Sequence, residues 1–408
     1  MTFANQTLAC PSTARPSISA PMVWLFAAAT GVIVLNVFAS QTLIGPIGAA
    51  LRLGDAAAGL VSMATLLGYA TGLFLLVPLA DLVENRRLVV TMLAVAIAAA
   101  TAAAVTSAAV AFLIELFVLG AASSTIQILL PMAASMAPPE RRGRVVGDVA
   151  SGLMIGIVLS RPLASFIADV ASWRAFYVAN AFALGVLVVV LARALPRRQP
   201  QMRSGYLALL GSLWHLFRGE PVLRQRALSA SLVMAAFSVF WTTIALRLAT
   251  APFHLDQRGI ALFALAGASG ALAAPITGRA GDRGWARATI VLCHLTIMAA
   301  FALAAWSGSL AAASPLTLLA VMAVAAVMLD FGVIGDQTLG RRAVNLLQPE
   351  ARGRLNALFV GLFFLGGAIG SAVAGLAWAH GGWVWVCIAG GIFGALGLGV
   401  DGLGERAR

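Results

Sequence analysis

The chain has 408 residues, of which 61% are hydrophobic and 10% are charged, and its mean hydropathy is +0.95. Soluble domains average about 45–50% apolar and about 25% charged residues, so this composition excludes an ordinary soluble domain and indicates an all-α membrane protein. All 27 basic residues are arginine, which excludes phosphate-binding loops and Schiff-base enzymes because both depend on lysine.

A polar tail over residues 1–21 precedes a series of apolar runs, each near the ~20 residues that a helix needs to cross the hydrocarbon. A polar connection over 195–226 divides these runs into bundles of six at 22–194 and 227–400, and a tail over 401–408 follows. The connection contains YLALLGSLWHLF, which predicts a helix lying on the membrane surface. The twelve predicted spans are 22–45, 57–79, 88–106, 108–136, 145–168, 174–194, 227–250, 259–279, 287–306, 315–339, 355–378 and 382–400.

Most arginines lie in alternate loops, together with the long connection and both ends of the chain. Basic residues are retained on the cytoplasmic side of a membrane, so we expect both termini in the cytoplasm. The net charge of +12 is then a consequence of topology, and nucleic-acid binding is not expected.

The two predicted bundles repeat in sequence. PPERRGRV at 138–145 returns as QPEARGRL at 348–355, and the same shift pairs Gln127 with Gln337. Parallel repeats of this kind are typical of secondary transporters.

The connections between spans two and three and between spans eight and nine carry related motifs. The first reads VPLADLVENRR at 77–87 and the second GRAGDRGWAR at 278–287. With the twofold arrangement of six spans, they make the chain resemble the major facilitator superfamily over nearly its whole length. The resemblance implies twelve transmembrane helices in two halves related by pseudo-twofold symmetry, working by alternating access.

The resemblance also implies a cytoplasmic gate, in which the motif aspartate faces a helix N-terminus of the other half. A helix N-terminus carries about half a positive charge, which attracts a carboxylate. Asp81 is expected near Gly353 and Arg354, and Asp282 near Gly143 and Arg144. The full set of gate candidates is Asp81, Arg86, Arg87, Asp282, Arg283, Arg287, Asp148, Arg144 and Arg354.

Within the superfamily, the drug:proton antiporters resemble this chain most. Span five reads GIVLSRP at 156–162, which keeps Gly156 and Pro162 of that branch's motif, whereas Leu116 stands where the branch has an arginine. The resemblance implies export of a drug or metabolite.

Charged residues inside a span cost at least ~2.5–3.5 kcal/mol at the bilayer centre, so each is a functional candidate. Arg161 and Glu115 are expected at similar depth on consecutive spans, about 10–12 Å below the outer surface at 1.5 Å per residue. We predict that they pair. The pair is either static, or Arg161 faces the cavity and binds an anionic substrate or alternates with protons on Glu115.

Asp330 lies near the middle of span ten and is the preferred proton site, since burial favours the protonated form of a carboxyl group. The alternative is a hydrogen-bonded structural carboxylate. Asp336 is expected to form a salt bridge near Arg341 and Arg342. Gln127 and Gln337 either line the cavity or pack between helices.

No cofactor, metal site or enzymatic activity is predicted, because the three cysteines are far apart and the four histidines are scattered. We expect a monomeric, proton-coupled exporter of a small organic molecule in a bacterial inner membrane. The alternative is an uptake symporter for an organic anion that binds at Arg161. A membrane sensor on the same fold is a third class, and a channel is less favoured.

Overall fold

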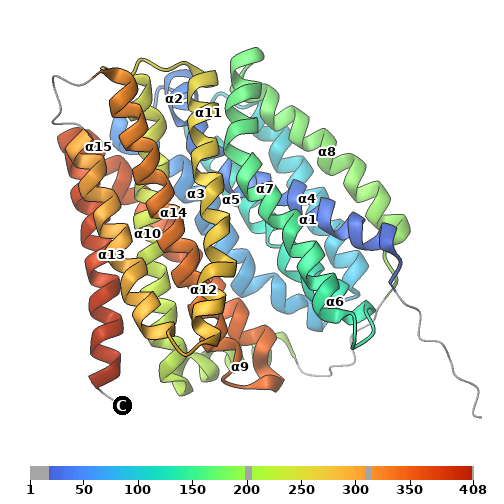
Figure 1. Cartoon of the computed structure of the whole chain (residues 1–408). Helices are drawn as coiled ribbons and strands as arrows, with labels where there is room; N and C mark the ends of the chain where they lie inside the picture. The colour runs from blue at the N-terminus through green and yellow to red at the C-terminus, as the bar shows by residue number, and fades with distance from the viewer. Residues whose placement is uncertain (1–17, 198–204, 308–313, 407–408) are drawn as a thin grey trace, which may run out of the picture.

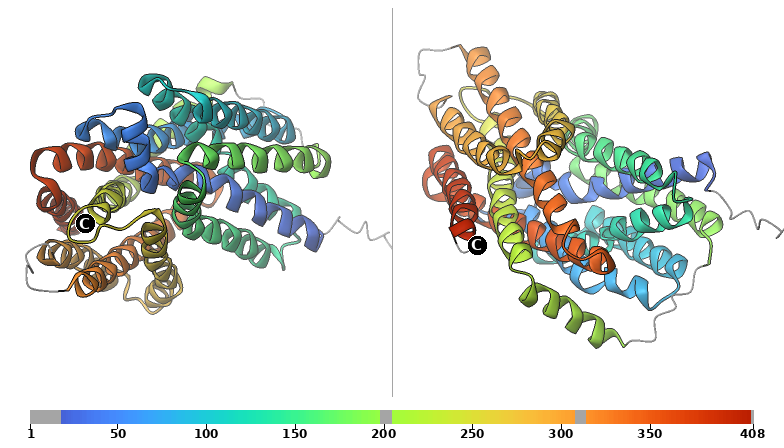
Figure 2. Two further views of the ribbon diagram at one scale, coloured as in Figure 1. Left: turned by 90° about the horizontal axis from the view of Figure 1, so that it is seen from above. Right: turned by 60° about the horizontal axis from the view of Figure 1, so that its bottom comes forward.

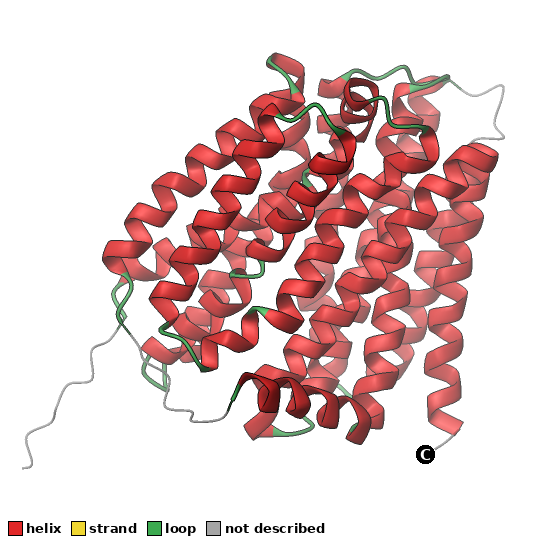
Figure 3. Ribbon diagram, turned by 180° about the vertical axis from the view of Figure 1, so that it is seen from behind, coloured by secondary structure: helices red, strands yellow, loops and turns green. Residues whose placement is uncertain are grey.

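The computed structural model describes residues 18–197, 205–307 and 314–406, and every regular element within these ranges is a helix (Figure 3). The predictions made for residues 1–17, 198–204 and 407–408 lie outside the described residues. The all-α fold class is confirmed for the part of the chain that the structure describes.

The N-terminal half consists of helices that run between the two ends of a bundle (Figure 1). Their bounds are α1 Ala20–Phe38, α2 Ser40–Leu51, α3 Asp55–Leu75, η1 Val77–Asp81, α4 Asn85–Val105, α5 Ala109–Ser123, α6 Ile126–Met136, α7 Arg142–Val170 and α8 Trp173–Ala194. The predicted span 108–136 breaks between α5 and α6, where the Ser124 and Thr125 hydroxyls donate to the carbonyls of Ala121 and Ala122. Such local bonds compete with the helical hydrogen-bond ladder.

The C-terminal half has longer helices and one strongly interrupted span. Its elements are α9 Tyr206–Gly219, α10 Pro221–Ala249, α11 Gln257–Ala264, η2 Leu265–Leu272, α12 Ala273–Asp282, α13 Ala286–Ser307, α14 Pro315–Asn345, η3 Pro349–Ala351 and α15 Arg352–Arg406. The predicted span 259–279 is divided among α11, η2 and α12.

Ten helical stretches in the described residues are long and apolar enough to cross a membrane. One of them lies in α15, whose 55 residues would extend for about 80 Å at 1.5 Å per residue, against a hydrocarbon thickness of about 30 Å. The backbone of α15 leaves the helical conformation at Gly381 and Gly382, and Gly382 has a positive φ of 60°. This break lies between the predicted spans 355–378 and 382–400. The count of twelve spans stays a prediction.

The two halves lie largely on opposite sides of the molecule (Figure 2) and meet where α3 packs against α15. A Cβ atom on Gly59 would collide with the backbone carbonyl oxygen of Ser371, and one on Gly375 would lie 2.5 Å from the carbonyl oxygen of Ala56. Small residues allow membrane helices to approach this closely. The halves are therefore in backbone contact near the N-terminus of α3.

The surface helix predicted in the connection is α9, which lies across the bottom of the bundle in Figure 1. The Tyr206 hydroxyl donates to the Leu75 carbonyl of the N-terminal half, and the Gln348 amide donates to Glu220 beside α10. We call this end the arginine-rich end, since it carries α9 and the motif loops, and the other the opposite end.

Candidate functional site

A cavity of about 270 Å³ lies between the two halves, with walls from α1, α3, α6, α7, α10, α11, η2, α14 and α15. Its surface is mostly apolar, with a few polar side chains, as is typical of sites for small organic ligands. The polar lining residues are Tyr69, Gln127, Arg161, Asp330, Gln337, Arg341 and Asn356.

Arg161 lies in this cavity wall and is 4% exposed. Its Nε donates to the Gln41 side-chain oxygen at 2.8 Å, and its backbone carbonyl accepts a bond from the Thr42 hydroxyl. Within the described part of the chain, its buried Nη2 has no hydrogen-bond partner. The guanidinium therefore keeps a free donor.

The predicted pairing of Arg161 with Glu115 is wrong. Arg161 contacts Gln41 instead, and a carboxylate oxygen of Glu115 on α5 is buried without a partner among the described residues. Similar depth on consecutive helices does not fix the rotation of each helix about its axis, and α7 turns Arg161 toward the cavity.

Aromatic rings surround the Arg161 guanidinium. Its central carbon lies 4.2 Å from the centroid of the Trp241 ring, 5.0 Å from that of Phe237 and 5.3 Å from that of Phe38. Cation–π contacts of this kind stabilise a desolvated cation by up to about 2 kcal/mol. They hold Arg161 in the cavity without neutralising its charge.

Asp330 lies across the cavity on α14 and is also 4% exposed. Its Oδ1 accepts a hydrogen bond of 2.8 Å from the indole nitrogen of Trp241. Trp241 thus presents its ring face to Arg161 and its N–H to Asp330. The two charged groups interact electrostatically but form no ion pair within 4.0 Å in the described structure.

Gln127 and Gln337 both lie in the cavity wall, and Gln127 donates a long bond of 3.4 Å to the Tyr69 hydroxyl. The structure thus favours the cavity interpretation over packing between helices.

Arg341 is a cavity residue that the sequence analysis placed in a loop. Helix α14 continues to Asn345, beyond the predicted end at 339, and carries Arg341 into the wall near Tyr69. Its Nε is buried with no hydrogen-bond partner in the described ranges. Asp330, Ile334, Gln337 and Arg341 follow the i, i+4, i+7, i+11 spacing of one helix face, a signal that could have identified it.

The cavity continues toward the arginine-rich end. Gln127 also lines a second cavity of about 500 Å³, which reaches Asp81, Gly353 and Arg354. Gln337 and Arg341 also line a third of about 650 Å³, which reaches Arg352. Toward the opposite end, Phe38 and Phe237 of the two halves meet edge to face at 6.4 Å. This conformation is therefore more open toward the arginine-rich end.

The gate candidates occupy that end. Asp81 shares the second cavity with Gly353 and Arg354, and Arg354 acts on it electrostatically. Asp282 forms an ion pair with Arg342 at 2.6 Å, so in this conformation its partner is on α14 of the same half rather than at Gly143 and Arg144. Arg144 and Asp148 are exposed on α7. Of the other candidates, Arg86 and Arg87 lie in the first turn of α4, Arg283 directly follows α12, and Arg287 lies in the first turn of α13.

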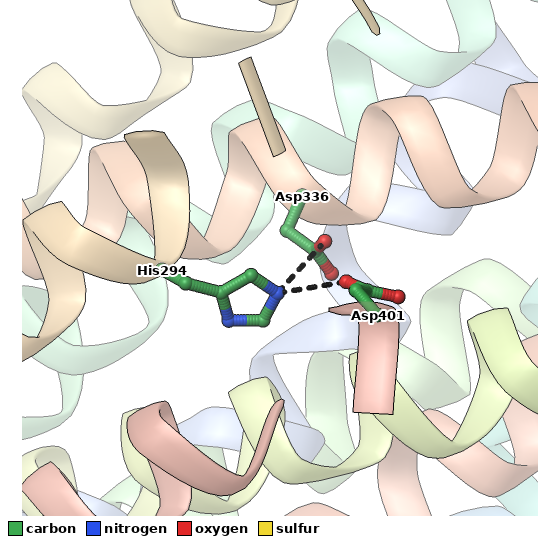
Figure 4. Close-up of side chains that lie close together, drawn as sticks. All are labelled: His294, Asp336 and Asp401. Atoms are coloured by element: carbon green, nitrogen blue, oxygen red, sulfur yellow. Dashed lines mark hydrogen bonds and ion pairs between the residues drawn. The ribbon is translucent and has the colours of Figure 1, made fainter. Parts of the chain in front are cut away.

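A second group of charges is buried inside the C-terminal half, outside the cavity wall. Arg226 donates from Nη2 to Asp336 Oδ1 and from Nη1 to Asp401 Oδ1, each at 2.7 Å. His294 Nε2 lies 3.0 Å from Asp401 Oδ2 and 3.7 Å from Asp336 Oδ1, so the three side chains point toward one another (Figure 4). Asp336 has the predicted salt bridge, but its partner is Arg226 rather than Arg341 or Arg342. The sequence analysis did not identify His294 or Asp401.

The sequence matches the profile of the Major Facilitator Superfamily over residues 25–339. It is 35% identical over 378 residues to a protein of Escherichia coli O157:H7 described as "Uncharacterized transporter YgaY", covering 91% of this chain and 93% of the relative. It is 32% identical over 390 residues to "Probable transporter SCO4007" of Streptomyces coelicolor, covering 95% and 89%.

Solved structures share the fold at low sequence identity. A peptide transporter in complex with sulfate matches with a TM-score of 0.77 at 14% identity, covering 96% of each chain. A D-xylose–proton symporter matches with a TM-score of 0.71 at 14% identity, covering 94% of this chain and 97% of the other. The chain belongs to the major facilitator superfamily and is a multi-pass membrane transporter of the secondary type, not an enzyme.

Proposed function

We propose that this transporter moves a small organic anion together with a proton, with Arg161 and Arg341 supplying the positive charge of the binding cavity. The supporting observation is the charge of the cavity: two arginines and one aspartate line it, and each arginine has a buried nitrogen without a hydrogen-bond partner in the described structure. Guanidinium groups bind carboxylates through strong charge-assisted hydrogen bonds.

Asp330 is the proposed proton acceptor. When it is ionised, its charge offsets that of Arg161 on the other side of Trp241 and weakens binding of an anion. When it is protonated, both arginine charges are available to the substrate. Proton and anion therefore favour each other's binding, and such coupling is reciprocal.

The sign of the substrate charge then determines the mode of transport. An anion binds best with the proton and travels with it, which is symport and, under an inward proton gradient, uptake. A cation would compete with the proton for Asp330, which is antiport and export. The cavity charge favours the first of these over the export expected from the sequence.

The cavity walls indicate an apolar body for the substrate. Phe38, Phe237, Phe363 and Phe364 line the site together with aliphatic side chains, and aromatic rings pack well against flat apolar groups. A small aromatic carboxylate fits both the walls and the arginines.

Export of a lipophilic cation is the second candidate, because the same rings and Asp330 could bind a cation. Arg161 already lies over the rings of Phe38, Phe237 and Trp241, which opposes a second positive charge there.

The proposed alternating-access cycle also requires the two halves to close at the arginine-rich end. Asp81 would move to the start of α15 near Gly353 and Arg354, whose backbone N–H groups and guanidinium attract a carboxylate. The excess of arginine supports a cytoplasmic position for this end. We further propose a bacterial inner membrane as the location and a monomer as the acting unit.

The test uses purified protein in liposomes with an imposed inward proton gradient. Uptake of labelled 4-hydroxybenzoate under this gradient, and uptake of tetraphenylphosphonium with the gradient reversed so that protons leave in exchange, is compared for the unmodified protein, Arg341→Gln, Asp330→Asn and the exposed-site control Arg193→Gln. We expect gradient-driven uptake of the anion that Arg341→Gln and Asp330→Asn abolish and Arg193→Gln preserves. Transport of the cation in exchange for protons, without transport of the anion, would replace this proposal with the second candidate.

A further inference from the structure

We call the buried group of Arg226, Asp336, Asp401 and His294 the arginine–histidine cluster. Its positive and negative charges do not balance. With both carboxylates ionised and the imidazole neutral, one positive charge faces two negative charges. All four residues are at most 7% exposed. A net charge in such a place is costly unless another group compensates it.

The hydrogen bonds determine the tautomer of His294. An ionised carboxylate only accepts hydrogen bonds, so the 3.0 Å contact with Asp401 Oδ2 requires a proton on Nε2. Ser229 donates to the same oxygen at 2.8 Å and therefore leaves it an acceptor.

The other ring nitrogen is open. His294 Nδ1 is buried and has no hydrogen-bond partner among the described residues, so in the neutral ring its lone pair is free. A Cβ atom on Gly397 would lie 3.0 Å from Nδ1, and the glycine thus leaves room beside this nitrogen.

Each helix packed against His294 contributes to its electrostatic surroundings. Helix α10 supplies Arg226 and Ser229, α14 supplies Asp336, and α15 supplies Asp401. Cys293 is adjacent on α13 itself. Helix α12 also packs on α13, and in the described structure its Asp282 forms an ion pair with Arg342 rather than with the ring. Two carboxylates therefore face the imidazole directly.

We propose that the arginine–histidine cluster is a second proton-binding site, separate from the cavity, in which the additional proton adds to Nδ1 of His294. The imidazolium neutralises the cluster and lies between Asp336 and Asp401. A divalent metal would instead lie close to the guanidinium of Arg226, which already occupies one oxygen of each carboxylate. Asp401, near the end of α15, is 7% exposed, whereas His294 and Asp336 are 0% exposed. A proton would therefore reach the histidine by way of Asp401.

The site is well placed to influence transport. Asp336 is adjacent to Gln337, and helix α14 also carries Asp330 and Arg341 of the cavity. Binding of a proton to the cluster acts on the helix that carries the substrate-facing groups. The inference does not depend on which substrate the cavity binds.

The experiment leaves His294 as the only histidine. His215, His254 and His380 are exposed, so the variant His215→Gln, His254→Asn, His380→Gln keeps the cluster intact; asparagine suits the positive φ of 47° at position 254. The protein is labelled with ¹⁵N-histidine, placed in lipid nanodiscs and studied by NMR between about pH 5 and pH 8, where histidine changes charge.

We expect Nε2 to carry a proton at every pH and Nδ1 to change from unprotonated to protonated as the pH falls. Asp401→Asn should weaken proton binding about tenfold or more, because it removes a nearby negative charge. A ring that stays neutral throughout the range, or in which Nε2 is the nitrogen that gains the proton, would overturn the proposal. Because these signals need no substrate, the result is independent of the transport assay.

Discussion

The cavity and the arginine–histidine cluster contain the same kinds of charged residue in opposite arrangements. In the cluster, Arg226 donates to two carboxylates at 2.7 Å, and all its partners belong to the C-terminal half. In the cavity, Arg161 of the N-terminal half and Asp330 of the C-terminal half are separated by Trp241. Groups of one half can stay together while the halves rock, whereas groups of opposite halves must separate.

This difference indicates which arginines can still bind a ligand. Arg226 uses both Nη atoms on carboxylates and has only its Nε without a partner in the described structure, outside the cavity wall. Arg161 and Arg341, with an unpartnered Nη2 and Nε in the described residues, line the cavity. We conclude that the cluster holds α10, α13, α14 and α15 together around its proposed proton site, and that the cavity arginines are available to a ligand.

Removing the arginine of the cluster should have the largest effect. Arg226→Met leaves two buried carboxylates without their cation, and breaking a buried ion pair in this way costs about 3–5 kcal/mol. We expect a large loss of unfolding free energy, measured by denaturation in detergent micelles. The exposed control Arg193→Met should change it by less than about 0.5 kcal/mol.

The charge and the packing of the Arg226 side chain can be separated by further substitutions. Adding Asp336→Asn and Asp401→Asn to Arg226→Met removes the uncompensated carboxylates and should restore much of the stability. A triple variant as unstable as Arg226→Met would show that the guanidinium acts through packing alone.

Removing the arginine of the cavity should leave the fold intact and affect binding. Arg161→Gln loses a charge-assisted hydrogen bond to the proposed anion, worth about 1.5–3 kcal/mol, so the KM for the anion should rise about 10- to 100-fold. The measurement is concentration-dependent uptake in liposomes, with unfolding followed in parallel. An unchanged KM in a stable variant would remove Arg161 from the site.

The sequence predicted the elements that depend on local pattern. Apolar runs of about 20 residues located most helices, and the position of Asp330 in the middle of its span indicated a buried carboxyl group, as the structure has it. The end of α14 was predicted too early because the paired arginines at 341 and 342 were interpreted as a loop, although only Arg342 forms a surface ion pair.

The contacts between distant segments could not be predicted. Arg226, His294, Asp336 and Asp401 come from four helices and share no sequence spacing, so only the packing of the C-terminal half brings them together. Arg161 received the wrong partner for a related reason. Depth in the membrane follows from residue count, whereas the direction of a side chain around its helix depends on the packing of neighbouring helices.

Closure at the opposite end can be tested through the contact between α3 and α15. Gly59→Ala introduces a Cβ that collides with the Ser371 carbonyl, and overpacking typically costs about 1–3 kcal/mol. The population closed at this end should fall by about 5- to 150-fold. Spin labels at Asp55 and His380, in a background without native cysteines, would report a longer distance. The control Gly185→Ala has open space around its Cβ and should leave the distance unchanged.

The ion pair between Asp282 and Arg342 should have the smallest effect on stability. Its side chains are 72% and 39% exposed, and exposed pairs contribute at most about 1 kcal/mol, less at high salt. Because both residues belong to the C-terminal half, Asp282→Asn should lower the unfolding free energy slightly and leave the distance between the halves at the arginine-rich end unchanged. Spin labels at Arg86 and Arg352 would measure that distance. If Asp282→Asn instead shifts the population open at this end, Asp282 exchanges Arg342 for Gly143 and Arg144 when the gate closes, as the family resemblance implies, and a pair within one half would then take part in the conformational change.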